Sequence, residues 1–257
     1  MNKRVLALLL CLLPSLGWAQ SWTPPEWTGF SYPKVIFNNK ATETQGWAIY
    51  SALIPDPEAF IRQHALWVAQ TLYGSALDSI PQVQKIQYSF EDREGISAKG
   101  GAPPVVHIFY SSRWVEKTKT DQGLDAVLYE TRGVLYHELT HAYQLEPQGI
   151  GGYKQGTEFW AFIEGMADAV RYHNGFFPVS RRKAGGHWMD GYRTTGYFLQ
   201  WLTCKDPEFL RKFNASTRHI IPWSFDQAMQ HVFGPHVTTD SLWEEYQAFL
   251  TKDVHPE

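Results

Sequence analysis

Two histidines and a glutamate near the middle of the chain have a spacing that could support metal-dependent hydrolysis. The segment 136–144, YHELTHAYQ, contains His137, Glu138 and His141. On a helix, at about 100° per residue, His141 lies about 40° from His137 and about 60° from Glu138, so the three side chains share one face. Two neutral imidazoles one turn apart can bind a single Zn²⁺, and the carboxylate between them can accept a proton from a water molecule beside the metal.

The composition of the chain makes an accidental match to this motif uncommon. The chain has 10 histidines and 15 glutamates among 257 residues. This composition gives about 0.02 chance occurrences of His-Glu-x-x-His. The alternative interpretation is a pair of histidines on a helix surface, without a metal, so the surrounding sequence has to distinguish the two.

A second pair of titratable residues follows in the segment 158–172, EFWAFIEGMADAVRY. Glu164 and Asp168 stand at positions i and i+4, so a helix brings both carboxylates to one face. A solvated helix face is the ordinary explanation for such a pair, but the neighbouring residues are apolar on nearly every side. A buried carboxylate requires a positive charge or a hydrogen-bond donor beside it. A metal ion would meet this requirement, which favours one site shared by the two segments.

Both groups of residues fall on predicted helices. Apolar residues at helical spacing predict one helix over 124–146 and another over 157–173. The charged, Gly-rich segment 91–104 is interpreted as a connection. Further helices are predicted at 56–74, 190–203, 224–233 and 241–251, and strands at 35–37, 83–90 and 105–111, the first strand ending in a turn at Asn38-Asn39.

The order of these elements predicts an α+β fold. Strands and helices do not alternate regularly, which argues against a doubly wound sheet. A mixed part of sheet and helix at about 35–146 precedes a mainly helical part at about 150–252, and the two would meet near the motif. We interpret residues 20–257 as one domain formed by these two lobes.

The first residues have the layout of a secretory signal peptide. Lys3 and Arg4 precede an apolar run at 5–13 that is too short to span a membrane, and cleavage is expected after Ala19. Without residues 1–19 the chain would be secreted or periplasmic, with no membrane anchor. Its formal net charge would fall from −3 to −5, and this mild acidity argues against nucleic acid as a partner. Nothing in the sequence indicates the oligomeric state.

Three blocks of the sequence follow one another in an order that is more specific than the first motif alone. They are HELTHAYQ at 137–144, FIEGMADAVRY at 162–172 and GYRTTGYFLQWL at 191–202. The chain thereby resembles the plant basic secretory protein family and its bacterial relatives, which have approximately HExTHxxQ, GLIEGIADYVR and GYxxTAxFLxW at these places. The segment 106–116, VHIFYSSRWVE, is also similar to the strand and turn that precede the active helix in that family.

The resemblance covers roughly residues 35–250 and departs from the family pattern in a few places. Ala161-Phe162 replaces the usual Gly-Leu, Gly196 stands where alanine is common, and the chain is acidic despite the family name. None of these departures changes a residue of the expected ligand set.

The resemblance implies a zincin-like metallopeptidase with one Zn²⁺ per chain. By similarity to metallopeptidases of the thermolysin-like, glutamate-ligand type, the metal would be held by His137, His141 and Glu164. Glu138 would be the general base. Asp168 would hydrogen-bond a ligand histidine, without binding the metal itself, and fix the orientation of its ring.

Three further residues are weaker candidates for a role at the site. A phenol or an imidazole commonly stabilises the oxyanion in zinc proteolysis, so Tyr192 and His187 are both possible donors, although packing explains Tyr192 equally well. Arg171 follows Asp168 and could pair with a carboxylate or interact with the C-terminal end of its helix.

These features support three hypotheses about function. The first is a secreted zinc endopeptidase that acts on peptides or proteins, with the strand at 105–111 lying along the cleft and pairing with extended substrate. The second is a secreted zinc-containing protein that binds a glycan or a cell-surface polymer without proteolysis. Structural zinc sites normally have four protein ligands, and only three are evident here, which favours the first hypothesis. The third is zinc-dependent hydrolysis of another kind of bond.

Overall fold

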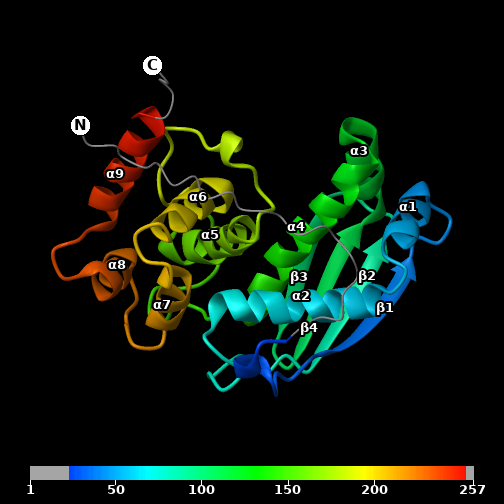
Figure 1. Ribbon diagram of the computed structural model, residues 1–257, viewed down its shortest axis with the longest axis horizontal. Coiled ribbons are helices and arrows are strands. Elements are labelled where there is room, and N and C mark those ends of the chain that lie inside the picture. Colours follow the sequence, from blue (N-terminus) through cyan, green and yellow to red (C-terminus); the bar gives the residue numbers. More distant parts are fainter. Residues whose placement is uncertain (1–22, 253–257) are drawn as a thin grey trace, which may run out of the picture.

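The computed structural model describes residues 23–252, so the predicted signal peptide at 1–19 lies outside the described residues. Within this range, the strands and helices of residues 34–143 lie on one side of the molecule and the helices of residues 158–252 on the other (Figure 1). The strands are β1 (Lys34–Lys40), β2 (Lys85–Glu91), β3 (Ser97–Ala102) and β4 (Val105–Ser111). The helices are α1 (Gln45–Leu53), α2 (Pro57–Leu72), α3 (Ser112–Gln122), α4 (Leu124–Tyr143), α5 (Glu158–His173), α6 (Tyr192–Leu202), α7 (Phe209–Ser216), α8 (Phe225–Phe233) and α9 (Thr239–Lys252), with short 3₁₀ turns at Pro25–Trp27 and Val179–Arg181.

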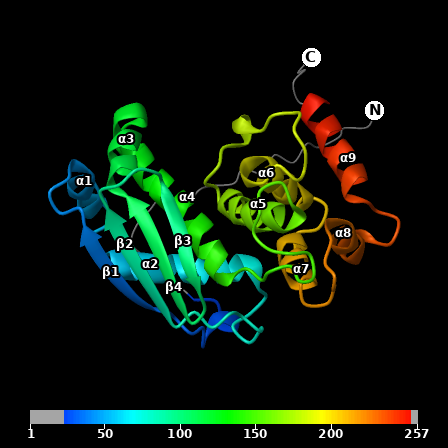
Figure 2. The ribbon, with the colours of Figure 1, turned by 180° about the vertical axis from the view of Figure 1, so that it is seen from behind.

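The described strands form one mixed sheet in the order β1-β2-β4-β3. β1, β2 and β4 are parallel, and β3 runs antiparallel to β4 at the edge of the sheet, beside α4 (Figure 2). Alternate residues of β2 are buried, among them Tyr88 and Phe90, which is the pattern of a sheet with one face packed on helices. On the same face, the Tyr110 hydroxyl of β4 lies 3.1 Å from Oγ1 of Thr131 on α4. The sheet therefore contacts α4 through β3 and through the Tyr110 side chain of β4.

Helix α5 is buried along nearly its whole length and packs against both α4 and α6. Two glycines allow α5 and α6 to approach closely. A Cβ atom on Gly165 would collide with the Thr195 side chain, and a Cβ atom on Gly196 would lie 2.7 Å from Cβ of Asp168. Gly196, one of the departures from the family pattern, therefore provides the space that the Asp168 side chain occupies, because a larger residue would collide with it. This packing fixes which face of α5 is turned toward α4.

The α+β fold class is confirmed, and so are the predicted helices and strands, most of them within about two residues of the expected ends, as is usual for element boundaries. Side chains cap the starts of two of these helices. The side chain of Asp56 accepts a hydrogen bond from Ala59 N at 2.9 Å at the start of α2. The side chain of Thr157 accepts one from Trp160 N at 3.3 Å at the start of α5.

Two predictions about local structure were wrong. The segment 91–104, interpreted as a connection, contains β3, and the expected turn at Asn38-Asn39 lies inside β1. The sequence of β3, SAKGGA, has no β-branched or aromatic residue, so its strand conformation depends on hydrogen bonds with β4 rather than on side-chain preference. Three helices were also not predicted: α1, α3 and α7.

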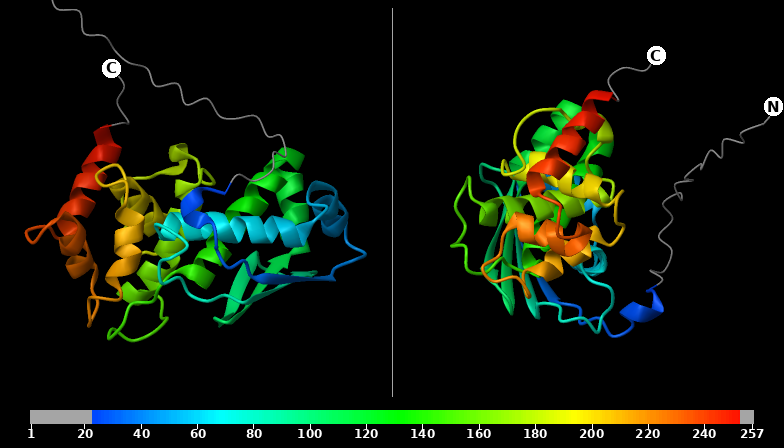
Figure 3. Two further views of the ribbon diagram at one scale, coloured as in Figure 1. Left: turned by 60° about the horizontal axis from the view of Figure 1, so that its bottom comes forward. Right: turned by 90° about the vertical axis from the view of Figure 1, so that its left-hand side faces the viewer.

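The side of the molecule away from the sheet consists of helices alone within residues 158–252. α6 contacts α9, and α8 contacts both α7 and α9. The orange α8 and red α9 lie at the end of the molecule away from the sheet (Figure 3). Among the helices of residues 23–252, none combines the length and the apolar character needed to cross a membrane.

Candidate metal centre

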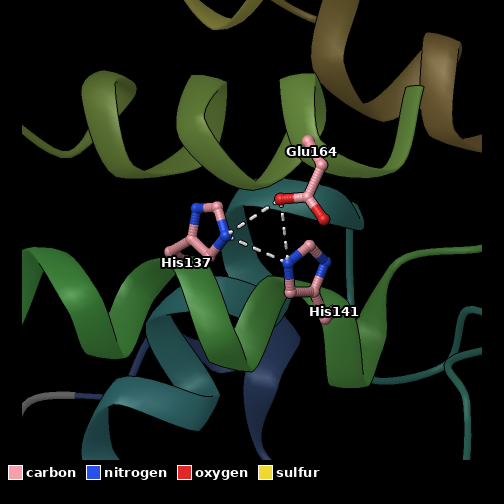
Figure 4. Close-up of side chains that lie close together, drawn as sticks. All are labelled: His137, His141 and Glu164. Atoms are coloured by element: carbon pink, nitrogen blue, oxygen red, sulfur yellow. Dashed lines mark hydrogen bonds and ion pairs between the residues drawn. The ribbon is translucent and has the colours of Figure 1, made fainter. Parts of the chain in front are cut away.

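Helices α4 and α5 bring two histidines and a glutamate together. His137 and His141 project from α4 toward Glu164 on α5 (Figure 4). The two Nε2 atoms lie 3.0 Å apart, and Oε2 of Glu164 lies 3.3 Å from Nε2 of His137 and 3.6 Å from Nε2 of His141. Ligand atoms of a tetrahedral zinc site, at bond lengths near 2.05 Å, are about 3.3 Å apart. The three atoms are therefore close enough to hold one metal ion.

Each histidine of this cluster has a second polar partner on its other ring nitrogen. Nδ1 of His137 lies 2.7 Å from Oδ1 of Asp168, so a hydrogen on Nδ1 leaves the lone pair of Nε2 directed at the cluster. Nδ1 of His141 lies 3.1 Å from Nε2 of Gln144. The other amide atom, Oε1 of Gln144, is buried and has no hydrogen-bond partner among residues 23–252. A half-turn of the amide exchanges these two atoms, gives Oε1 a donor and directs the Nε2 lone pair of His141 at the cluster.

The charges at the centre favour a positively charged group between the carboxylates. Burial lowers the pKa of the His137 imidazole, but the nearby carboxylates of Asp168 and Glu164 outweigh it and raise the pKa to about 10. Burial would raise the pKa of the Glu164 carboxyl, but its hydrogen bonds with His137 and His141 hold that pKa well below its usual range. A proton and a metal ion compete for the same His137 nitrogen, so the arrangement that favours the proton also fits a cation of higher charge.

Glu138 lies on α4 with the two histidines of this cluster. Its side chain is 4% exposed, and Oε1 accepts a hydrogen bond of 2.6 Å from the Ser97 hydroxyl of β3. Glu138 and the cluster both line one open cleft of about 1200 Å³. The Glu138 carboxylate therefore lines the same cleft as the three ligand atoms, and it is not itself a member of the ligand group.

Two tyrosines, Tyr153 and Tyr192, line the cleft near the three ligand residues. The ring of Tyr192 is nearly parallel to that of His137, with 6.1 Å between centroids and 13° between planes. Its backbone has a φ of 40°, a value that is uncommon for residues other than glycine and that costs energy. The hydroxyl of Tyr153, from the loop between α4 and α5, donates a hydrogen bond to Oε1 of Glu164.

Three residues at the centre were not identified from the sequence: Ser97, Gln144 and Tyr153. Tyr153 stands in the glycine-rich loop QGIGGYKQG at 148–156, and that composition was the available signal. Gln144 is the last residue of the first family block. Ser97 had no signal, because its role depends on the strand that was missed.

Among the described residues, two of the weaker candidates form no hydrogen bond or ion pair with the three ligand residues, although Arg171 lines the same cleft. His187 is exposed, its Nδ1 accepts a hydrogen bond from Met189 N, and it is not among the residues that line the cleft. Arg171 forms a 2.7 Å ion pair with Glu130 of α4, which supports the interpretation as a carboxylate partner. Its guanidinium packs over Gly133, where any side chain would collide with it.

The strand expected to pair with substrate is not available. Within the sheet β4 lies between β2 and β3, so both of its edges are occupied. The prediction that residues 105–111 lie along the cleft was therefore wrong. The strand at this edge of the sheet is β3, and the segment 96–99 lines the cleft together with residues of α5.

Comparisons with known proteins agree with this arrangement. A family model described as "Peptidase of plants and bacteria" matches residues 33–246, which include every element from β1 to α8. No curated protein and no solved structure matches the chain. The match spans most of the sequence and confirms the resemblance to the basic secretory proteins. The chain therefore belongs to this family of peptidases of plants and bacteria, BSP.

Proposed function

We propose that the protein is a secreted endopeptidase that depends on one zinc ion. The family gives the general class, a peptidase. The observation that most supports a zinc mechanism is the group of three ligand atoms beside a buried glutamate in an open cleft. Zinc suits two imidazole nitrogens and a carboxylate oxygen, and three protein ligands leave one position open, as in catalytic zinc sites.

The residues of the chain then have separate tasks. His137, His141 and Glu164 would hold the ion. When bound, zinc lowers the pKa of water and polarises the carbonyl of the peptide bond. The Glu138 carboxylate accepts the proton of the attacking water and delivers it to the nitrogen of the leaving amine.

The polar partners of the two histidines would fix the orientation of the imidazole rings, so that each Nε2 lone pair points at the metal. We propose that Asp168 orients His137 and that Gln144 orients His141, each through the Nδ1 atom. Such partners fix the tautomer of the ring and increase its basicity, and they typically contribute about 10- to 100-fold to metal affinity.

Replacement of Asp168 by asparagine should weaken zinc binding by about 10- to 100-fold while the protein remains folded. The amide can no longer carry the negative charge that supports a donor at Nδ1 of His137. Competition with a chromophoric chelator measures the affinity. Asp190→Asn is the matched control, because Asp190 also lines the cleft but its carboxylate accepts from the backbone of His187. Equal affinities of the wild type and both variants would contradict the proposed role of Asp168.

A tyrosine hydroxyl is proposed to stabilise the negative charge that develops on the carbonyl oxygen. Tyr192 is our first choice because its ring is stacked on His137 and its backbone is in a costly conformation, which is a frequent feature of active sites. Tyr153 is the second, since its hydroxyl already reaches Glu164.

Substrate would lie along the edge of β3. An extended peptide can add to an exposed sheet edge through main-chain hydrogen bonds, with side chains alternating between the cleft and solvent. The segment 96–99 lines the cleft and is close to Glu138 through Ser97. This arrangement would bring a peptide bond in the middle of a chain to the centre, which is why we propose an endopeptidase.

We propose that the mature protein acts in the periplasm or outside the cell. This part of the proposal rests on the residues 1–19 with their basic start, apolar run and small residues before the expected cleavage site.

The direct test is hydrolysis of an unbiased peptide library, with the metal content of the purified protein measured on the same sample. We expect cleavage at internal bonds, close to one zinc per chain, loss of cleavage after chelation and recovery when zinc is added back. Mass spectrometry identifies the cleaved bonds. Cleavage that continues unchanged after the metal has been removed would contradict the zinc mechanism, and products that differ only at chain ends would contradict an endopeptidase.

A further inference from the structure

One hydrogen bond links the edge of the sheet to the proposed general base. The hydroxyl of Ser97, the first residue of β3, donates to Oε1 of Glu138 at 2.6 Å, across 41 positions of sequence. Within residues 23–252, no hydrogen bond to the other oxygen, Oε2, is found. The two oxygens of this carboxylate therefore differ in their surroundings.

The backbone around Ser97 is held by the neighbouring strand. Ser97 pairs with Tyr110 in the antiparallel ladder, and Ser111 N donates to the carbonyl of Ile96 at 2.9 Å. Residues of β3 alternate in direction, so Ser97 and Lys99 are partly buried while Ala98 is exposed. The ladder with β4 therefore fixes the backbone of Ser97, and its hydroxyl points toward α4.

A glutamate side chain needs such a partner in order to act as a base in one fixed position. Its terminal torsion is broad, so the two oxygens of an unrestrained carboxylate exchange freely, and fixing the side chain costs conformational entropy. A hydrogen bond to an ionised acceptor is stronger than one between neutral groups. One bond at Oε1 is enough to select a single orientation, with Oε2 left to accept a proton.

We propose that Ser97 is a positioning residue for the Glu138 carboxylate, holding Oε1 so that Oε2 receives the proton of the attacking water. Because Ser97 belongs to the edge strand, the surface that would pair with substrate and the base that would act on it are joined by a single side chain. This inference rests on the proposed peptidase mechanism and adds to it a residue outside the three family blocks.

The test compares two hydrogen bonds that both join the sheet to α4. Ser97→Ala removes the bond in the cleft. Thr131→Val removes the bond between Thr131 and Tyr110, which is buried behind the helix and away from the cleft. A purely structural role of Ser97 would give the two variants the same behaviour.

For Ser97→Ala we expect kcat to fall by about 10- to 100-fold, the range for loss of one hydrogen bond to a charged group. KM, zinc affinity and the midpoint of thermal unfolding should change no more than they do in Thr131→Val. Ser97→Thr keeps the hydroxyl and should restore most of kcat. In a Glu138→Gln background, Ser97→Ala should have no further effect on kcat, because the two residues act through one group.

Several results would overturn the inference. A Ser97→Ala protein as active as the wild type, while Glu138→Gln is inactive, would remove Ser97 and leave the peptidase mechanism intact. Equal losses of activity in Ser97→Ala and Thr131→Val, or loss of zinc from Ser97→Ala alone, would show a structural role. A wild type that binds zinc but cleaves no peptide would remove the proposed function, and the inference with it.

Discussion

Replacement of Glu138 by glutamine should leave zinc in place and reduce peptide hydrolysis by at least about 10²- to 10⁴-fold, the contribution of positioned proton transfer. The amide is nearly isosteric with the carboxylate, and its oxygen can still accept the hydrogen bond from Ser97. It cannot accept a proton from water. The measurement is the rate of cleavage of a peptide that the wild type hydrolyses, with zinc content determined on both proteins.

Glu146→Gln is the control for this substitution. Glu146 is exposed and lines the same cleft, so the change removes the same charge without touching the proposed base. Its kcat should remain close to that of the wild type. Equal activity of the wild type and Glu138→Gln, at equal zinc content, would exclude Glu138 from proton transfer.

Replacement of His137 or His141 by alanine should abolish both the bound metal and the hydrolysis. Each change removes one of the three ligands and one imidazole partner of the buried Glu164 carboxylate. His137→Ala also removes the imidazole partner of Asp168. Removing one partner of a buried charge pair is costly, so these variants should also unfold at a lower temperature than the zinc-free wild type. Metal analysis after dialysis and thermal unfolding are the two measurements.

His187→Ala is the matched histidine control for this experiment. His187 is exposed and lies outside the set of residues that line the cleft, so its removal should change neither metal content nor activity. Retention of about one zinc per chain by both His137→Ala and His141→Ala would place the metal elsewhere and contradict the proposed centre.

The two experiments together also separate the peptidase from the alternative of a zinc-containing binding protein. In a binding protein the histidine variants would lose the metal, whereas Glu138→Gln would keep the zinc content and ligand binding of the wild type. Neither the wild type nor any variant would cleave peptides. The coordination chemistry is shared by both functions, and only the comparison of Glu138→Gln with the wild type reports on proton transfer.

The features that the sequence alone determined are those that depend on helical periodicity. His137, Glu138 and His141 share a face because of their spacing on one helix, and the same is true of Glu164 and Asp168. A helix closes its hydrogen bonds within itself, so residue spacing is enough to predict which side chains point together. The structure brings both groups to one place, and their roles at a metal remain predictions.

Strand arrangement could not be predicted in the same way. Residues 105–111 were expected to be a strand, and they are β4, yet the sequence could not show whether that strand lies inside the sheet or at its edge. β3 has no β-branched or aromatic side chain, and its ladder hydrogen bonds are made to another segment, β4. A strand is stabilised by its partner, so its existence and its neighbours depend on the whole sheet.

Tertiary structure alone decided which residues surround the predicted ligands. Ser97 reaches Glu138 only because β3 pairs with β4 beside α4, and Tyr153 reaches Glu164 only because its loop folds back over α5. Gly196 has no chemistry of its own, yet it allows α6 to approach Asp168. The residues with ligand chemistry, and Asp168 beside them, were recognisable from type and local spacing. Ser97, Tyr153 and Gly196 are ordinary residue types, and their importance arises from contacts between segments distant in the chain.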